Sequence, residues 1–520
     1  MKQLSIILLL FSPVLFAQTY EHYFDYKTID TNNISANFSN YGGLYNGANW
    51  LLLTPYEWIV YDASPWIVGK FNGAPAAALN EWFYLYSPGP IINGQAGIIA
   101  QPEDSLTFRI YKISKGDDNS NPDYAQWPDT LGAPINQNGD PLIYGDQTLW
   151  TVYNGVDSTL NARNWYEDYF PPLPVEIRQT VFAHTGNYND AYDVFSNVIF
   201  MEWIIINKGE LPIDSAYFGF WSDIDFDINF RNYPAVDSTY QVAYCWGDTT
   251  GILEPDPAVG FQLLYGPVIV SAGDTAIFKG RRLPGYKNLP MTSFHGIGDD
   301  ADFDPLTGSI RSLNDTWNAA RGFDLNGNVI INPVTNAPTR FPFNGDPVTQ
   351  QGWYQFPTSW VGGGAGVLFF SGPFNLAPQD TQWAMVALVP GLSGTNLESI
   401  VDMREKAAIL SSLPYDTLSG IPVFKDDGNG NIPNKFTLYQ NYPNPFNSGT
   451  TIKISTLKKV QVNLIVYDIL GAKVKELKNE VMDPGFYEIR FNAANLSSGV
   501  YFYQLKAGDF IQTKKMVFLK

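Results

Sequence analysis

The clearest β-strand pattern in the sequence reads Val175-Glu-Ile-Arg-Gln-Thr-Val-Phe182 and, further on, Asn197-Val-Ile-Phe-Met-Glu-Trp-Ile-Ile-Ile206. Both runs are rich in β-branched and aromatic residues, and Asn207-Lys208-Gly209 provides a turn after the second. The pattern predicts another strand over Ser215–Asp227. Long strands that are joined by tight turns, with little helix between them, predict an antiparallel β-sandwich.

Similar apolar runs extend this pattern along the chain. We expect strands at 241–246, 258–271, 367–371 and 383–390. Leu106–Ile113 alternates well enough to predict another strand, whereas the polar stretches Lys115–Pro141 and Gly296–Pro347 are predicted as loops.

One late segment has the period of a helix instead. Apolar residues from Leu397 to Leu410 lie mostly on one helical face, Thr395 or Asn396 can cap the start, and Pro414 ends the segment. We therefore predict a mainly β fold, with a large antiparallel β-sandwich body and one late helix, residues 396–413.

The charge of the chain changes sign near Phe436. The whole sequence of 520 residues carries a net charge of −19. The part from Phe436 onward holds 11 Lys and Arg against 6 Asp and Glu, which leaves 21 and 45 for the rest. Such a reversal indicates a domain boundary, and the acidic body argues against binding of nucleic acid. We divide the chain into a signal peptide (1–17), an aromatic-rich β region of the body (18–174), the β-sandwich part of the body (175–420), a linker (421–435) and a C-terminal domain (436–520).

The N-terminus has the features of a secretory signal. Lys2 supplies the positive charge, Leu4–Phe16 the apolar core, and Ala17 a small residue before the expected cleavage point. No other apolar run is long enough to span a membrane, so we expect no transmembrane segment after cleavage. Cys245 is the single cysteine, which excludes an internal disulfide, and we interpret it as a small buried residue.

The C-terminal domain carries several motifs in a fixed order. It opens with Phe436-Thr-Leu-Tyr-Gln-Asn-Tyr-Pro-Asn-Pro-Phe-Asn447. Val462-Asn-Leu-Ile-Val-Tyr-Asp-Ile-Leu-Gly471, Leu496-Ser-Ser-Gly-Val-Tyr-Phe-Tyr-Gln-Leu505 and a basic ending, Lys514–Lys520, follow. These motifs resemble the type A sorting domain of the type IX secretion system. The residues that carry the sorting motif are Tyr442, Pro443, Asn444, Pro445, Phe446, Asn447, Gly499, Tyr501, Lys514 and Lys515.

Alternating apolar residues in this domain predict a small immunoglobulin-like β-sandwich of about seven strands. Pro443 and Pro445 cannot donate to a sheet, so the opening motif is expected at an edge or a turn. The resemblance implies that an outer-membrane translocon recognises the domain, which is then cleaved. The cargo is released outside the cell or anchored to surface lipopolysaccharide.

Alternating carboxylates form the sharpest feature of the body. Asp223, Asp225 and Asp227 would share one face of a strand, and Asp237 could close a cation site. A structural Ca²⁺ ion, a solvated acidic strand end and a pair of catalytic carboxylates all fit this pattern. Asp299, Asp300, Asp302 and Asp304 with Asp324 form a second acidic group, for which ordinary turn formation is the stronger interpretation.

The common enzyme motifs are largely absent. Only His22, His184 and His295 could serve a Ser-His-Asp triad, and a lone histidine is more often structural. Two hypotheses follow. The body is a structural, adhesive or polymer-binding protein of the cell surface, with extracellular polysaccharide as a possible partner. Alternatively, it is a secreted carbohydrate-active or other hydrolase that uses paired carboxylates.

Overall fold

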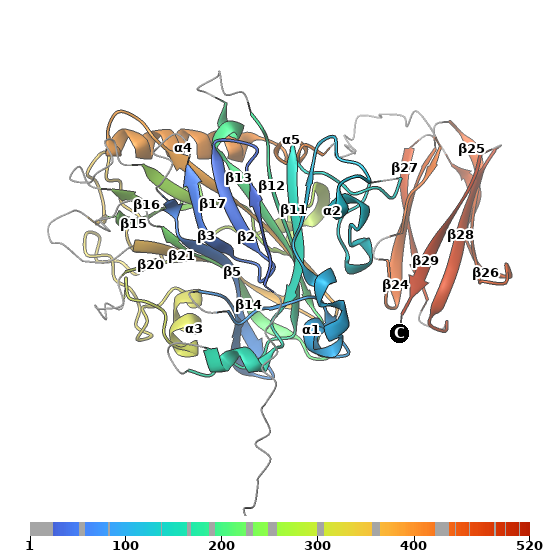
Figure 1. Ribbon diagram of the computed structural model, residues 1–520, viewed down its shortest axis with the longest axis horizontal. Coiled ribbons are helices and arrows are strands. Elements are labelled where there is room, and N and C mark those ends of the chain that lie inside the picture. Colours follow the sequence, from blue (N-terminus) through green and yellow to red (C-terminus); the bar gives the residue numbers. More distant parts are fainter. Residues whose placement is uncertain are drawn as a thin grey trace, which may run out of the picture. The chain divides into compact units, whose positions relative to one another are not determined.

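The computed structural model describes most of the chain (Figure 1). The described residues are 24–50, 58–81, 84–136, 138–163, 168–186, 193–224, 232–247, 257–298, 306–355, 365–421, 436–441, 444–456, 458–482, 485–493, 496–508 and 510–519. The chain divides into two compact units, of which the first comprises residues 1–133 and 143–421 and the second residues 134–142 and 422–520. We call the first unit the body and the part from Phe436 onward the C-terminal unit. The predicted signal peptide and nearly all of the predicted linker lie outside the described residues.

The body is an antiparallel β-sandwich, as predicted. One layer is a nine-stranded sheet in which β13 and β22 are central. In spatial order its strands are β10 (Tyr111–Ser114), β11 (Gln147–Asn154), β12 (Val175–Ala183), β13 (Ile199–Asn207), β22 (Thr381–Gly391), β17 (Ala258–Tyr265), β16 (Val242–Gly247) and β15 (Asn232–Asp237), while β7 (Ser87–Pro88) pairs with β11.

The second layer consists of two smaller sheets. The five-stranded sheet has the order β20 (Ser293–Ile297), β21 (Ala365–Leu376), β14 (Ile213–Ile224), β5 (Asp62–Phe71) and β6 (Ala74–Ala78). The four-stranded sheet contains β1 (Tyr26–Ile29), β2 (Ile34–Ser39), β3 (Leu44–Trp50) and β4 (Trp58–Val60). Two hairpins, β8 (Ile91–Ile92) with β9 (Gln95–Ala96) and β18 (Val268–Phe278) with β19 (Arg281–Asn288), complete the strands of the described body.

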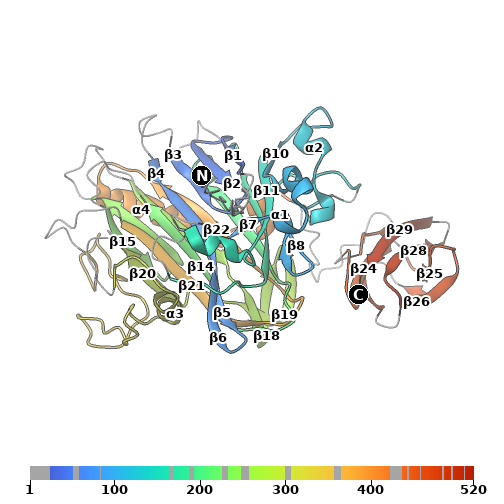
Figure 2. The ribbon, with the colours of Figure 1, turned by 60° about the horizontal axis from the view of Figure 1, so that its bottom comes forward.

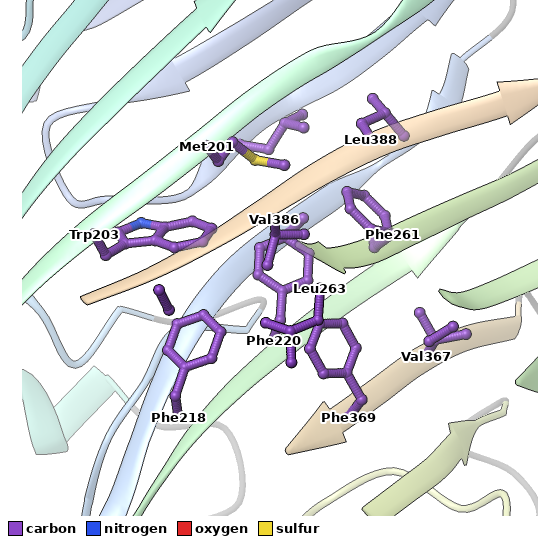
Figure 3. Packing of buried hydrophobic residues seen from close by; sticks show 14 of the residues in the cluster. Met201, Trp203, Phe218, Phe220, Phe261, Leu263, Val367, Phe369, Val386 and Leu388 are labelled. Carbon is purple, nitrogen blue, oxygen red and sulfur yellow. The ribbon is translucent and has the colours of Figure 1, made fainter. Parts of the chain in front are cut away.

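The main core fills the space between the two layers. Alternate residues of β13 and β14, among them Trp203 and Phe220, face each other there and are almost fully buried (Figure 3). The face of each of these two sheets that points away from the main core carries a helix. On the nine-stranded sheet, α4 (Asn396–Ser412) buries Met403 against Gly260, and on the five-stranded sheet α3 (Leu313–Arg321) covers a second cluster around Trp221.

The described helices and helical turns are otherwise short. They are α1 (Gly97–Ala100), η1 (Pro102–Phe108), α2 (Pro122–Ala125), η2 (Asp129–Leu131), η3 (Ser158–Arg163), η4 (Val194–Asn197) and α5 (Tyr415–Ser419). None of the helices in the described ranges is both long and apolar enough to cross a membrane.

Three local predictions for the body were wrong. Leu106–Ile113 does not form one strand, because a 3₁₀ turn buries Phe108 before β10 begins at Tyr111. Ala258–Ser271 is interrupted at Gly266 and Pro267, and Pro267 has no N–H for a sheet. The predicted loop Gly296–Pro347 contains α3, whose start is capped by the Ser312 side chain.

The C-terminal unit is a small sandwich of two antiparallel sheets (Figure 2). One sheet has the order β23 (Thr437–Leu438), β24 (Gly449–Thr456) and β27 (Gly485–Asn492). The other has the order β26 (Lys473–Met482), β25 (Val460–Tyr467), β28 (Gly499–Ala507) and β29 (Phe510–Phe518). Seven strands were predicted here and seven are found in the described residues. Their alternating apolar residues form a separate core, in which Leu464 and Tyr503 are fully buried.

Candidate functional site

Two carboxylates of the body stand directly opposite each other. Asp223 on β14 is the cross-strand partner of Asp62 on β5. Directly opposed residues of an antiparallel pair point to the same face, with Cβ atoms about 4.5–5.5 Å apart. Two hydrogen bonds hold this pair in register: Tyr61 N donates to Asp223 O at 2.9 Å, and the Ser222 side chain donates through Oγ to Asp62 O at 3.2 Å. The pair lies on the face of the sheet that carries Trp221, away from the main core.

The Asp62 carboxyl group loses its proton less readily than an ordinary aspartate. Burial raises the pKa of Asp62 well above its ordinary value, and the negative charge of Asp223 raises it further. A hydrogen bond from the Ala63 N–H to the Asp62 carboxylate opposes both effects only in part. A proton is therefore retained on Asp62 to a higher pH than on an ordinary aspartate. Two neighbouring carboxyl groups of this kind can supply an acid and a base, or can hold a cation.

Several tyrosine side chains lie near Asp62. Tyr84 lies 5.0 Å from Tyr41 between ring centroids. Burial raises the pKa of the Tyr84 phenol, and the charge of Asp62 and the phenols of Tyr45, Tyr41 and Tyr61 add to the effect. The Tyr84 hydroxyl therefore remains a hydrogen-bond donor at neutral pH.

The turn at Gly42 and Gly43 lies against Tyr153 and close to Asp62. Gly42 has φ +87°, and a Cβ atom there would overlap the ring of Tyr153. A Cβ atom on Gly43 would stand 3.6 Å from Asp62 Oδ1. The backbone of this turn therefore approaches the Asp62 carboxylate closely.

Exposed aromatic rings extend from the tyrosines. Phe24, Tyr26, Trp58 and Tyr61 are between 37% and 50% exposed. Their ring contacts form two groups. In one, the Phe24 ring centroid lies 4.5 Å from that of Tyr45, and in the other the Trp58 centroid lies 5.3 Å from that of Tyr61. We call the whole group the acidic–aromatic surface. Its members are Phe24, Tyr26, Tyr41, Tyr45, Trp58, Tyr61, Asp62, Tyr84 and Asp223.

The sequence prediction found only one member of this surface, Asp223. Asp225 and Asp227 lie outside the described residues. Asp237 is described, and its carboxylate accepts from Thr239 N and pairs with Arg404 Nε at 3.0 Å. Asn232, which starts the same strand, bonds Ile224 O, so Asp237 lies five residues, or roughly 16 Å, further along β15. The structure therefore does not bring Asp223 and Asp237 together.

The described residues contain no group of three or more His, Cys, Asp or Glu side chains that could hold a metal ion. The calcium site stays a prediction because two of its four carboxylates are not described. Of the second acidic group, Asp299, Asp300, Asp302 and Asp304 are also outside the described ranges. Asp324 closes a local turn by accepting from Asn328 N at 2.7 Å.

The two described histidines and the cysteine have structural surroundings. His295 Nε2 lies 2.9 Å from Gly308 O and His184 Nε2 lies 2.8 Å from Leu418 O. Cys245 is buried with its Sγ 3.3 Å from Ala365 O, and burial raises the pKa of the thiol. These surroundings fit the interpretation of Cys245 as a small buried residue.

In the C-terminal unit, the first and last motifs lie against each other. Asn444 Oδ1 accepts from Val517 N at 2.7 Å, and Phe446 N donates to Val517 O at 3.0 Å. Phe446 O accepts from Leu519 N at 2.9 Å. The opening motif therefore covers part of the outer edge of β29, the last strand. This arrangement agrees with the expectation that the proline motif lies at an edge or turn.

The remaining sorting residues occupy β28, β29 and their surroundings. Gly499 pairs with Phe518, and the Tyr501 hydroxyl donates to Ser497 O at 2.8 Å. Lys514 and Lys515 lie opposite Tyr503 and Phe502. Pro445 and Asn447 flank the bridge that Phe446 makes with Phe518. Tyr442 and Pro443 lie outside the described residues.

Comparison with known families agrees with this architecture. Residues 440–519 match the family described as the secretion system C-terminal sorting domain. The C-terminal unit is therefore a sorting domain of this family, and it indicates export by the type IX secretion system to the cell surface or the extracellular space. The secretion machinery is accordingly a partner of the chain.

Three solved structures show distant similarity to this chain. A chain titled as a polysaccharide lyase has 9% identity and a TM-score of 0.18, with 66% of this chain and 34% of that chain covered. Dimeric latent PorU from Porphyromonas gingivalis has 10% identity and a TM-score of 0.15, with 74% and 33% covered. Pullulanase from Bacillus acidopullulyticus has 14% identity and a TM-score of 0.12, with 52% and 36% covered. This chain thus spans about a third of each, and the search of curated proteins gave no match.

Proposed function

We propose that the body is a cell-surface or extracellular protein that binds a carbohydrate polymer at the acidic–aromatic surface. The observation that carries this proposal is the presence of two groups of partly exposed rings near Asp62, which pairs with Asp223 across the strands. Aromatic rings offer flat apolar faces on which sugar rings can stack, and phenols and carboxylates can bond sugar hydroxyls. An adhesive or structural role at the cell surface would use the same contacts.

Binding to insoluble polysaccharides tests this proposal. The full mature chain is mixed with each of a panel of polysaccharides, and the bound fraction is measured after sedimentation. Trp58→Ala and Tyr26→Ala should lower binding to the polymer that the wild type binds. Tyr286→Ala is the matched control, because Tyr286 is 40% exposed but lies on the separate β18–β19 hairpin. The proposal would be contradicted if all three variants lost binding equally, or if none of them lost binding.

Hydrolysis of the bound polymer is a second candidate function, and the Asp62–Asp223 pair favours it. Retaining glycosidases use two carboxyl groups about 5–5.5 Å apart, one of which carries a proton. The raised pKa of Asp62 suits it for the acid, and Asp223 would then be the nucleophile. Asp62→Asn and Asp223→Asn should each abolish release of reducing ends without abolishing polymer binding. Release of reducing ends at the wild-type rate by both variants would exclude this function.

Calcium binding near Asp223, Asp225, Asp227 and Asp237 is a separate proposal that rests on the alternating carboxylates in the sequence. Calcium that binds the folded state should raise the unfolding temperature of the body. The comparison is between melts in calcium and in chelator, for the wild type and for Asp223→Ala. The proposal requires a calcium-dependent increase that Asp223→Ala reduces. Identical melts of the wild type in both buffers would rule it out.

A further inference from the structure

Sequence motifs that are far apart in the C-terminal unit meet at one end of its sandwich. Antiparallel pairing places Tyr467, the end of β25, opposite Phe502 near the start of β28, and Gly499 opposite Phe518 at the end of β29. The bonds of Asn444 and Phe446 to Val517 bring the opening motif to the same end. Figure 1 marks the C-terminus of the chain at this end. We call it the motif end.

The chain enters the unit at the other end. Thr437 pairs with Ser455, at the far end of β24 from Gly449. The ring of Phe436 lies 5.8 Å from Phe510, which begins β29. The motif end is therefore the end of the C-terminal unit that does not carry the connection to the linker.

The turn between β25 and β26 presents two aliphatic side chains at the motif end. Ile469 is 68% exposed and Leu470 is 87% exposed. Leu519, the residue after the last strand, is 53% exposed. Leu470 is the most exposed of the large apolar side chains in the described part of the chain.

This turn is well ordered by its own hydrogen bonds. Asp468 Oδ1 accepts from Leu470 N and from Ala472 N, both at 2.9 Å. Asp468 N donates to Ala472 O at 3.0 Å, and Gly471 takes φ +80°, which a residue with a side chain adopts only with strain. The backbone thus holds Ile469 and Leu470 in one arrangement that points away from the core of the unit. A fixed apolar pair needs little further ordering when it enters a pocket.

We propose that the motif end is the surface that the secretion machinery recognises, and that Ile469 and Leu470 insert into an apolar pocket of that machinery. The secretion machinery is the expected partner because residues 440–519 match a sorting domain. This match includes every segment that meets at the motif end. The inference rests on export by the type IX system and adds to it the site of contact.

An export assay with matched variants tests the inference. The full chain is expressed in a strain that carries the type IX system, and its amounts in the periplasm and outside the cell are measured. The double variant Ile469→Ser with Leu470→Ser should remain in the periplasm in a folded, protease-resistant form. The control carries Val481→Ser and Ile511→Ser, which remove exposed aliphatic side chains, 56% and 57% exposed, near the entry end. This control should be exported like the wild type.

Each outcome of the assay decides one point. Export of the double variant at the wild-type level overturns the inference. If the double variant does not fold, Leu470→Asn alone and the apolar exchange Leu470→Met replace it, and only Leu470→Met should be exported. Self-association of the wild type through these residues, with normal export of the variant, would assign the turn to a second copy and overturn the inference. Export of a chain that lacks residues 436–520 would instead refute the export route itself.

Discussion

Asn444 and Val517 are 73 residues apart in the chain and are joined by a hydrogen bond of 2.7 Å from the Val517 N–H to Asn444 Oδ1. Together with the two backbone bonds of Phe446, this contact ties the opening motif of the sorting domain to the outer edge of its last strand. An uncovered strand edge offers unpaired N–H and C=O groups to other chains. The opening motif therefore both positions the motif end and protects β29.

The first prediction concerns this contact. Asn444→Ala leaves the Val517 N–H without its partner and should destabilise the C-terminal unit by about 1 kcal/mol. Hydrogen exchange at the Val517 amide, measured by NMR, should become faster than in the wild type. Asn479→Ala is the control, because Asn479 is exposed on β26 and bonds Glu476 at the surface. Unchanged exchange at Val517 would show that the side chain does not hold the edge.

The second prediction concerns a buried ion pair in the body. Glu202 is 1% exposed, and its carboxylate bonds Lys279 Nζ at 2.6 Å and the Tyr415 hydroxyl at 2.9 Å. Lys279→Met should cost roughly 3–5 kcal/mol of unfolding free energy, because it leaves a buried charge without its cation. Urea unfolding of the full chain measures this loss.

The control is the double variant with Glu202→Gln and Lys279→Met, which removes the charge together with its partner. It should be more stable than Lys279→Met alone. A double variant that is less stable than the single one would indicate that the two residues act independently.

The sequence predicted the parts of the fold that depend on local pattern. The alternating residues around Val462 and Tyr501 predicted strands that are present, and the helix that begins at Asn396 ends one residue earlier than expected. The sequence also carried the signals of a helix, α3, in a segment that we predicted as a loop. Ser312 and Gly322 are the cap signals of α3, but the polar residues between them favoured a loop interpretation.

The candidate site depends on long-range pairing, which local pattern does not reveal. Asp62 follows an aromatic run and had no distinguishing feature in the sequence. Its importance arises only from the register of β5 against β14, which places Asp223 opposite it. The same limit applies to the covered edge of β29, because the partner of Asn444 is determined by the sandwich as a whole.

The third prediction concerns the single cysteine. Burial raises the pKa of the Cys245 thiol, so the reactive thiolate is rare at neutral pH and the sulfur is also inaccessible. A thiol reagent such as 5,5′-dithiobis(2-nitrobenzoic acid) should leave the native protein unlabelled and label one thiol per chain in denaturant. Rapid labelling of the native protein would show that the strands around Cys245 open readily.

The last prediction uses the pH dependence of Asp62. Its pKa is raised in the folded state above the ordinary 3.8, so the folded state binds this proton more tightly than the unfolded state does. Stability therefore falls as the pH rises from about 3.8 towards the raised pKa, because the folded state must then release a proton that it holds. Asp62→Asn removes this cost and keeps an oxygen for the Ala63 N–H.

At neutral pH, Asp62→Asn should therefore unfold at a temperature a few degrees higher than the wild type. This difference should disappear near pH 3.8, where the wild-type carboxyl is protonated in the folded state. Thermal melts across this pH range measure the difference. Asp214→Asn, an exposed change on β14, is the control for a general effect of charge removal. A gain in stability that grows towards acid pH would show that Asp62 is stabilising in its charged form.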